Sequence, residues 1–278
     1  MKRKLLRNAL LILLGVMVIF ASGCTDNSES ENTSVQEVPA QETTDEEMTD
    51  ETGNTAEGET ATEDEATDGY SPEIDPANFV EQIDNPYFPL TPGTTFVYED
   101  EDEEGATIDV EIYVTDETRE VMGVTTTVVR ETEWEDGELV EDTYDWFAQD
   151  ADGNVWYFGE ESNEYEDGEV VSTAGSWEAG VDGAQPGIIM QADPQIGDVY
   201  RQEYYEGEAE DMAEVIGLDD TATVAYGSFD NVLVTREWTP LEPGIEENKY
   251  YAMDVGLLME EKVEGGSETL ELVDIATE

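Results

Sequence analysis

The chain has 278 residues, and its 72 Asp and Glu against 10 Lys and Arg give a formal charge of −62 at pH 7. It contains no His, which excludes histidine-based catalytic triads, imidazole metal ligands and a histidine general base. Its one Cys excludes an intrachain disulfide and a cysteine-rich zinc site. The negative charge argues against nucleic-acid binding, because it would repel the phosphates.

The first 23 residues have the pattern of a signal peptide. Four basic residues lie within residues 2–7, an apolar run spans Ala9 to Phe20, and the tetrapeptide Ala-Ser-Gly-Cys ends at Cys24. A basic region, a short apolar region and small residues before a cleavage point are typical of export signals. The apolar run is shorter than the roughly 20 residues that a membrane-spanning helix needs. We therefore expect residues 1–23 to be removed rather than to remain as a membrane helix.

The tetrapeptide resembles the lipobox of prokaryotic lipoproteins, with Ala21 at the position that Leu usually holds. The resemblance implies that Cys24 becomes the first residue and carries lipid, with a diacylglyceryl group on its thiol and fatty-acyl chains such as palmitate. Two or more chains hold a protein stably at a membrane, since each buried CH₂ contributes about 0.8 kcal/mol. An ordinary secretory signal with an incidental cysteine is the alternative. The lipoprotein interpretation predicts an extracytoplasmic protein anchored to the cell membrane, facing the cell surface or the periplasm.

The charge becomes more extreme after cleavage, because the mature chain would keep 6 Lys and Arg against 72 Asp and Glu, a formal charge of −66. Such a surface repels itself, which destabilises the compact state in dilute salt. At about 1 M salt the Debye length falls to about 3 Å and the repulsion is screened. We favour a halophilic or salt-tolerant source. The alternative is an acidic cell-surface protein that binds Ca²⁺ or Mg²⁺.

Residues 24–70 are expected to form a disordered acidic linker that begins at the lipidated Cys24. The segment is rich in Glu, Thr, Asp and Ser and has few large apolar residues. It cannot bury enough surface to offset its ordering entropy. Flexible-chain scaling gives a reach of roughly 40 Å. A binding motif within this segment is the alternative to a simple tether.

Residues 71–278 are expected to form one β-rich globular domain. A short helix is predicted from Pro76 to Ile83, with Asp75 as its N-cap and proline at the first helical position. Apolar residues alternate over residues 108–114 before a turn expected at Asp116-Glu117, and residues 124–130 are rich in Thr and Val, which favours a strand.

Three Asp-Gly pairs, at residues 136–137, 152–153 and 167–168, separate apolar segments and predict the hairpins of an antiparallel meander. The stretch from Gly175 to Pro194 is rich in Gly, Pro and Ala and is expected to be a long ordered loop across one end of the sheet. Further strands are predicted at residues 199–205, 213–216, 221–224, 231–237, 248–252, 257–262 and 269–273.

Five segments resemble counterparts in a family of uncharacterised prokaryotic lipoproteins. They are NPYFPLxPGxxFxY at residues 85–98, ADGNVWYFG at 151–159, IGDVY at 196–200, YGSFDNVL at 226–233 and YYAxxVGL at 250–257. Phe96 stands where Trp is more usual, and Met253-Asp254 where Pro-Gly is usual. The resemblance implies one strongly curved antiparallel sheet, a half-barrel or open barrel similar to that of periplasmic lipoprotein carriers, and no established activity.

Aromatic residues of the predicted strands are candidates for the wall of a groove on the concave face of such a sheet. The residues selected are Tyr144, Trp146, Trp156, Phe158, Tyr204 and Tyr250. Their occupant would be an apolar or amphipathic ligand or a partner protein. The alternative is that these rings pack in the core and cover the sheet.

A weak metal candidate is the loop with oxygen-bearing side chains at Asp150, Asp152 and Asn154, which suits Ca²⁺. However, glycine falls at the fourth rather than the sixth position, and residues 155–158 have a strand pattern. We favour a plain Asp-Gly hairpin turn. No metal and no other cofactor is expected.

Four rare cations lie in predicted strands: Arg130, Arg201, Arg236 and Lys249. Structural pairing with carboxylates is the favoured interpretation, and a cluster that holds a carboxylate or phosphate head group is the alternative.

No catalytic residue is expected, so the domain is interpreted as non-enzymatic. The sequence GSFD at residues 227–230 lacks the G-x-S-x-G frame of a nucleophile elbow and has no histidine to act as its base. A carboxylate-based hydrolase is a minor alternative that would need two acids roughly 5 to 9 Å apart in an open cleft, at least one with a raised pKa. A structural acidic envelope protein, salt-adapted or cation-binding and without a specific ligand, is the main alternative to a ligand-binding lipoprotein.

Overall fold

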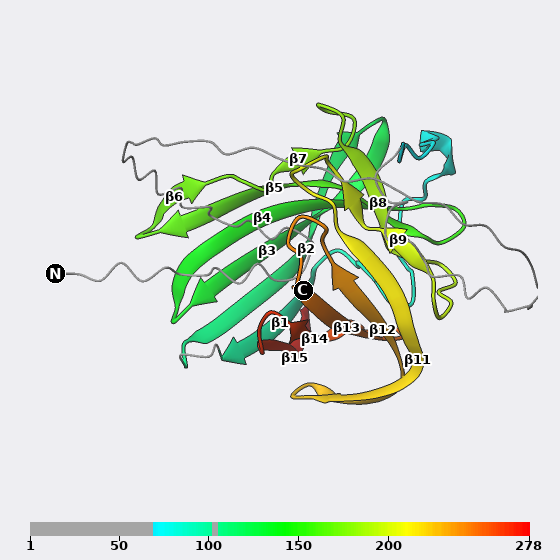
Figure 1. Cartoon of the computed structure of the whole chain (residues 1–278). Helices are drawn as coiled ribbons and strands as arrows, with labels where there is room; N and C mark the ends of the chain where they lie inside the picture. Colours follow the sequence, from blue (N-terminus) through cyan, green and yellow to red (C-terminus); the bar gives the residue numbers. More distant parts are fainter. Residues whose placement is uncertain (1–68, 102–104) are drawn as a thin grey trace, which may run out of the picture. The chain divides into compact units, whose positions relative to one another are not determined.

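The computed structural model describes residues 69–101 and 105–278 (Figure 1). The predicted signal peptide, the lipidated Cys24 and nearly all of the predicted linker lie outside the described residues. Among the described residues no helix is long and apolar enough to cross a membrane.

The described chain is almost entirely β, as predicted, and its strands form one open antiparallel sheet (Figure 1). The strands are β1 (Thr94–Glu101), β2 (Thr107–Val121), β3 (Val124–Glu135), β4 (Glu138–Gln149), β5 (Val155–Glu166), β6 (Glu169–Ser172), β7 (Trp177–Glu178), β8 (Gln185–Met190), β9 (Val199–Arg201), β10 (Glu203–Tyr204), β11 (Met212–Val224), β12 (Gly227–Trp238), β13 (Glu246–Ala252), β14 (Gly256–Glu264) and β15 (Thr269–Thr277). Their order is β10-β8-β5-β4-β3-β2-β1-β15-β14-β13-β12-β11-β9, with β6 and β7 also paired to β5.

The predicted turn at Asp116-Glu117 is wrong. Strand β2 continues to Val121, and only a register shift marks this region. The Thr115 hydroxyl donates to the Val128 carbonyl and accepts from the Glu117 amide, which satisfies the irregular backbone inside the strand. The chain reverses instead at residues 122–123, where both φ angles are positive, as a two-residue hairpin turn requires.

The three Asp-Gly hairpins are confirmed. The pairs at residues 136–137 and 167–168 form two-residue turns in which both residues have positive φ, and the pair at 152–153 lies in the longer connection between β4 and β5. These turns place β3, β4, β5 and β6 side by side in chain order.

The expected helix over residues 76–83 is not formed. Asp75 does cap a helical start, because its carboxylate accepts from the Ala77 amide, but only a 3₁₀ helix, η1 (Pro76–Asn78), follows. Phe79 then bridges to Asp150, and the Val80 amide donates to the Gln149 carbonyl. A helix of eight residues gains little hydrogen bonding for its ordering cost, so packing against the sheet prevails.

The stretch from Gly175 to Pro194 is not a continuous loop, which corrects the prediction. It contains β7 and β8, and β8 pairs with β5 through Trp156 opposite Ile188. The apolar Ile189 and Met190 of β8 are buried. Other boundaries also differ, since residues 213–224 form the single bulged strand β11 and residues 199–205 divide at Gln202 into β9 and β10.

The sheet is so strongly curved that side chains on its inner face approach one another. The Tyr98 hydroxyl on β1 donates to the Leu257 carbonyl on β14 at 3.1 Å, across the strand that separates them. The two ends of the strand order, β9 and β10, are joined by the single residue Gln202. We call the meeting of β8, β9 and β10 around Gln202 the seam.

Gly187 of β8 permits the close approach at the seam. A Cβ atom at this position would lie 2.3 Å from the carbonyl carbon of Gln202. Real Cβ atoms do not come so close to backbone, so any side chain would push β8 away from the β9–β10 connection.

We predict that Gly187→Ala lowers the free energy of unfolding by about 1–3 kcal/mol, the usual cost of overpacking. Thermal or denaturant melting measures it. Gly227→Ala is the matched control, because its Cβ would meet only ring atoms of Phe229 at 3.4 Å. Equal stability of the two variants would contradict the close contact at the seam.

Candidate functional site

The inward face of the curved sheet carries acidic side chains as well as the apolar core. Val110 lies opposite both Tyr98 and Glu133, so all three share one face. Tyr98 also lies opposite Leu272, and Glu260 follows on the same face of β14. We define the interior cluster as the buried residues Glu131, Glu133, Glu141, Asp145, Glu160, Glu203, Glu237, Lys249 and Glu260.

Lys249 is the cation of the interior cluster. Its ammonium nitrogen lies 3.0 Å from Oε2 of Glu237 and 3.5 Å from Oε2 of Glu260, and its side chain is 5% exposed. Burial alone would lower the pKa of Lys249, but the charges of these two carboxylates outweigh it and raise that pKa well above its ordinary value. One side of the cluster therefore holds a permanent cation, whose single charge offsets that of one of its two carboxylate partners.

At the opposite side of the interior cluster, the carboxylates have no contacting cation. Glu131, Asp145 and Glu160 come from neighbouring strands β3, β4 and β5, and Asp145 lies directly opposite Glu160. Burial raises the pKa of Asp145 to about 8, although a hydrogen bond from the Tyr157 hydroxyl works against the rise. Burial and the charge of Asp145 raise the pKa values of Glu131 and Glu160 well above their ordinary range.

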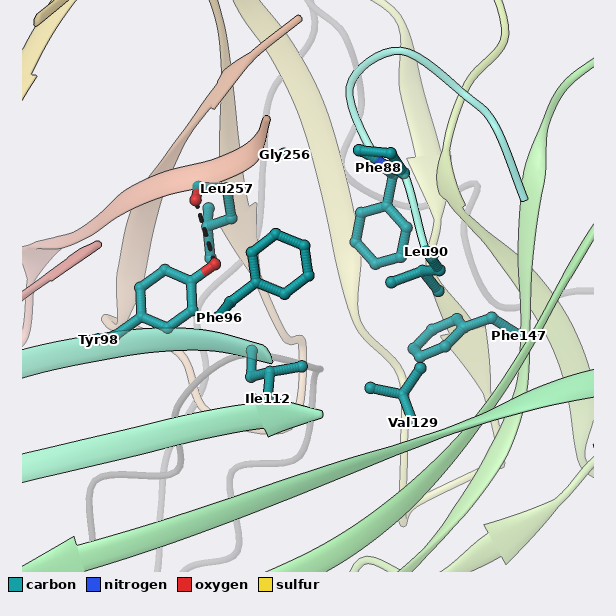
Figure 2. A pocket seen from close by; sticks show the side chains of 10 residues that line it. Phe88, Leu90, Phe96, Tyr98, Ile112, Val129, Phe147, Gly256 and Leu257 are labelled. Carbon is teal, nitrogen blue, oxygen red and sulfur yellow. Dashed lines mark hydrogen bonds between the residues drawn. The ribbon is translucent and has the colours of Figure 1, made fainter. Parts of the chain in front are cut away.

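An apolar cavity of about 40 Å³ lies beyond the acidic part of the interior. Figure 2 shows Phe88 and Leu90, from the segment before β1, on the same side as Phe147 and Val129, with Phe96 and Leu257 across from them. The lining residues are Phe88, Pro89, Leu90, Phe96, Tyr98, Ile112, Val129, Phe147, Gly256 and Leu257. For comparison, a cavity that accepts benzene measures about 150 Å³. The space accommodates only small groups.

The six residues selected as a ligand wall do not line this interior. Trp146 alternates with the inward-facing Asp145 and Phe147 on β4 and lies under the guanidinium of Arg119, 3.8 Å from the ring centre. Tyr144 shares that outward face. Trp156 and Phe158 are covered by Phe79, which meets both rings edge-on.

The last two candidates also lie outside the interior. Tyr204 follows the buried Glu203 and packs against Tyr70 and Arg201. The Tyr250 hydroxyl donates to Glu261. The six residues pack on the outer face, and their role as a ligand wall stays a prediction. The interior aromatic residues outside that selection of six are Tyr98, Phe147, Tyr157 and Tyr251.

Asp150 acts as the organising residue of the turn between β4 and β5. One of its oxygens accepts from the amides of Asp152 and Asn154, and the other accepts from the Asn154 side chain and the Trp156 indole. The donors to this carboxylate are N–H groups of the turn and of the first residues of β5. This is the hydrogen bonding of the Asp-Gly turn that the sequence favoured over a Ca²⁺ loop, and no group of acids in the described part of the chain is placed to hold a metal ion.

Structural pairing of the rare cations is confirmed for most of them. Arg130 pairs with Asp142 at 2.7 Å, and Arg236 pairs with Glu214 at 2.7 Å. Arg130 and Arg236 also lie over the rings of Tyr144 and Trp238. The same combination of carboxylate and aromatic partners recurs at Arg119, with Glu178 and Trp146. Together with Lys249 inside the sheet, these residues do not form one anion-binding cluster.

The interior carboxylates were not found from the sequence, although a signal was present. Glu131 and Glu133 alternate in step with Val129, and Asp145 alternates with Phe147, so strand periodicity places each acid on the same face as an apolar neighbour. What periodicity does not give is the inward curvature that buries that face along its whole length.

No protein-family model and no curated protein matches the chain. Two solved structures are similar in fold over 69% of this chain and 99% of theirs. One is a proposed exported protein with a YmcC-like fold from Bacteroides fragilis, at 14% identity and a TM-score of 0.43. The other is a proposed lipoprotein from Parabacteroides distasonis, at 12% identity and a TM-score of 0.41.

We predict that Lys249→Met strongly destabilises the domain at neutral pH. Removing one partner of a buried ion pair typically costs about 3–5 kcal/mol, because the remaining carboxylates are buried without compensation. Adding Glu237→Gln and Glu260→Gln should recover much of the loss, since the site is then neutral. Chemical denaturation measures both effects.

Arg130→Met is the control for this prediction, because its partly exposed pair with Asp142 should contribute no more than about 1 kcal/mol. If Lys249→Met were no more destabilising than Arg130→Met, the buried ion pairs would not be a main source of stability.

Proposed function

We propose that this chain is a non-enzymatic, extracytoplasmic lipoprotein, held to the cell membrane by lipid on Cys24, whose β domain is an acidic structural or interaction module of the envelope. The basic region, apolar run and lipobox-like tetrapeptide of residues 1–24 support the anchor. The observation that supports a module rather than an enzyme or a lipid carrier is the filling of the sheet's interior by its own side chains.

The burial of Asp145 and Glu160, which lie directly opposite each other, supports the non-enzymatic part of the proposal. Asp145 and Glu160 have the raised pKa values that acid catalysis uses, but they are 0% and 4% exposed. A hydrolase needs its carboxylate pair in an open cleft that admits substrate. These two side chains instead lie inside the folded domain.

The pairing of the surface cations supports a net acidic surface, because each of these cations is already paired within the domain. Arg119, Arg130, Arg236 and Lys262 each pair with a carboxylate of the same domain. A partner of this surface would therefore be recognised through acidic side chains, which select cationic groups and repel anionic lipid. Binding of a small apolar ligand in the cavity of Figure 2 is the second candidate, and the cavity's volume limits it to small groups.

We predict that Cys24→Ser abolishes the membrane anchor. In a bacterial expression host, the unaltered chain should fractionate with membranes and give a mature N-terminal peptide with the mass of lipidated Cys24. The variant should lack this mass and leave the membrane fraction or stay unprocessed. Mass spectrometry of the two N-terminal peptides measures this, and an unmodified Cys24 in the soluble fraction would contradict the proposal.

We also predict that salt stabilises the domain mainly by screening. The melting temperature should rise between low salt and about 1 M NaCl, where the Debye length is about 3 Å. CaCl₂ at matched ionic strength should give the same rise. A much larger effect of CaCl₂ would favour the cation-binding envelope protein over the salt-adapted one.

A further inference from the structure

We propose that Asp145, Glu160 and Glu203 form a proton-binding site inside the sheet, and that bound protons hold the seam closed. This proposal concerns the interior of the domain and does not depend on the lipid anchor or on the function proposed above.

The backbone register brings two of these carboxylates together. Asp145 on β4 lies directly opposite Glu160 on β5, so their side chains leave the same face with Cβ atoms about 5 Å apart. Glu203 reaches the same region from β10, at the seam, where the charge of Glu160 acts on it. The exposed fractions of the three residues are 0%, 4% and 0%.

Most oxygens of these carboxylates lack a hydrogen-bond donor. The Tyr157 hydroxyl donates to Oδ1 of Asp145, and the Trp177 indole and the backbone of Asp211 lie near Glu203 and act to lower its pKa. Oδ2 of Asp145, Oε1 of Glu160 and both oxygens of Glu203 nevertheless make no hydrogen bond of ordinary geometry. A buried ionised carboxylate without donors is strongly disfavoured. A proton turns one carboxylate oxygen into a donor, and a neighbouring carboxylate can then accept its hydrogen bond, so shared protons satisfy the arrangement that the backbone imposes.

The groups that surround the site cannot replace those protons. Those that interact directly with the three carboxylates are Glu131 on β3, Glu141 on β4, Tyr157 on β5 and Asp211 before β11. Beyond them lie Glu237 on β12, Lys249 on β13 and Glu260 on β14, which interact with Asp211 or Glu131. Lys249 is the cation among them, and it already contacts Glu237 and Glu260. Arg201 on β9, a buried cation at the seam, lies over the rings of Tyr70 and Tyr204. None of the ion pairs found in the described part of the chain includes Asp145, Glu160 or Glu203.

Proton binding reaches the seam through Glu203. Strand β10 has two residues and is joined to β8 by two pairs, Glu203 with Pro186 and Tyr204 with Gln185. Loss of protons from Glu160 and Glu203 would place two like charges in a buried space beside this short ladder. We therefore expect the seam to open first as the pH rises.

The sign of the pH dependence follows from the raised pKa values. Burial raises the pKa of Asp145 to about 8, and burial with the charges of neighbouring acids raises those of Glu160 and Glu203 well above the ordinary carboxyl value. The folded chain therefore binds protons that the unfolded chain releases at the same pH. The stability linked to these protons should be fully present at and below the ordinary carboxyl pKa of about 4 to 5, and it should be lost as the pH rises from there through the raised pKa values of the folded chain.

The first experiment measures melting temperature from pH 5 to pH 9 at constant high salt. We expect the melting temperature of the unaltered chain to fall with rising pH, and Glu160→Gln and Asp145→Asn to melt higher than it at pH 9 with a flatter slope. Glu161→Gln is the matched control, because Glu161 is the next residue of β5 and is exposed. It should keep the slope of the unaltered chain, and an equal slope in all four proteins would overturn the proposal.

The second experiment does not depend on variants that fold. Denaturant unfolding of the unaltered chain at pH 7 in weakly buffered solution should release at least one proton per chain, reported by an indicator dye. Infrared spectra of the folded chain should show a protonated carboxyl band that moves in D₂O. No proton release and no such band would overturn the proposal. A cation in place of protons would instead show as stabilisation at pH 9 by CaCl₂ beyond matched NaCl, and would also overturn it.

Hydrogen exchange at the seam is the third measurement. Amides of β8 and β10 should exchange faster at pH 9 than expected from the intrinsic pH effect, while amides of β2 and β3 should not. If the pH changed the exchange rates of β8 and β10 no more than those of β2 and β3, the link between the protons and the seam would be overturned.

Discussion

The interior of this sheet contains more carboxylates than its buried amine can balance. Lys249 contacts Glu237 and Glu260 at one side and offsets the charge of one carboxylate, but Glu131, Asp145 and Glu160 at the other side lie among apolar residues without a cation. An ionised carboxylate in such a place is disfavoured by desolvation, and several of them also repel each other. The fold therefore depends on keeping some of its interior carboxyl groups protonated and neutral, although the chain as a whole is strongly acidic.

The curvature of the sheet connects this constraint with the rest of the structure. A flat antiparallel sheet can leave one face in water, and acidic residues at alternate positions would then cost nothing. Here the strands continue around until the β9–β10 segment joins both ends of the strand order. Gly187 lets β8 approach Gln202 at the seam, and the carboxylates of β3, β4 and β5 lie buried on the inner face of the curved sheet. The curvature that builds the core thus also buries these charges.

The sequence predicted the β class, the Asp-Gly hairpins and most strands, because alternation and turn residues are local properties. It missed the position of the first β turn, since the hydroxyl of Thr115 stabilises an irregularity that resembles a turn in the sequence. It predicted a loop where β8 lies, because Pro186 and Gly187 normally disfavour a strand, and only the neighbouring backbone explains them. The interior carboxylates were missed for a related reason: burial along a curved face depends on residues far apart in the sequence.

The seam also has a consequence for how the chain reaches its folded state. The segment that joins both ends of the strand order lies in the middle of the described chain, between two groups of hairpins that each form from nearby residues. Strand β1, by contrast, must find β15, near the other end of the chain, before the two groups become one sheet. Contacts of such long sequence separation slow folding, because loop-closure entropy is lost before the contact forms. If the two groups of hairpins form before β1 pairs with β15, their unpaired strand edges are exposed during that time. Repulsion between the acidic surfaces of two copies of the chain then opposes pairing of these edges between molecules.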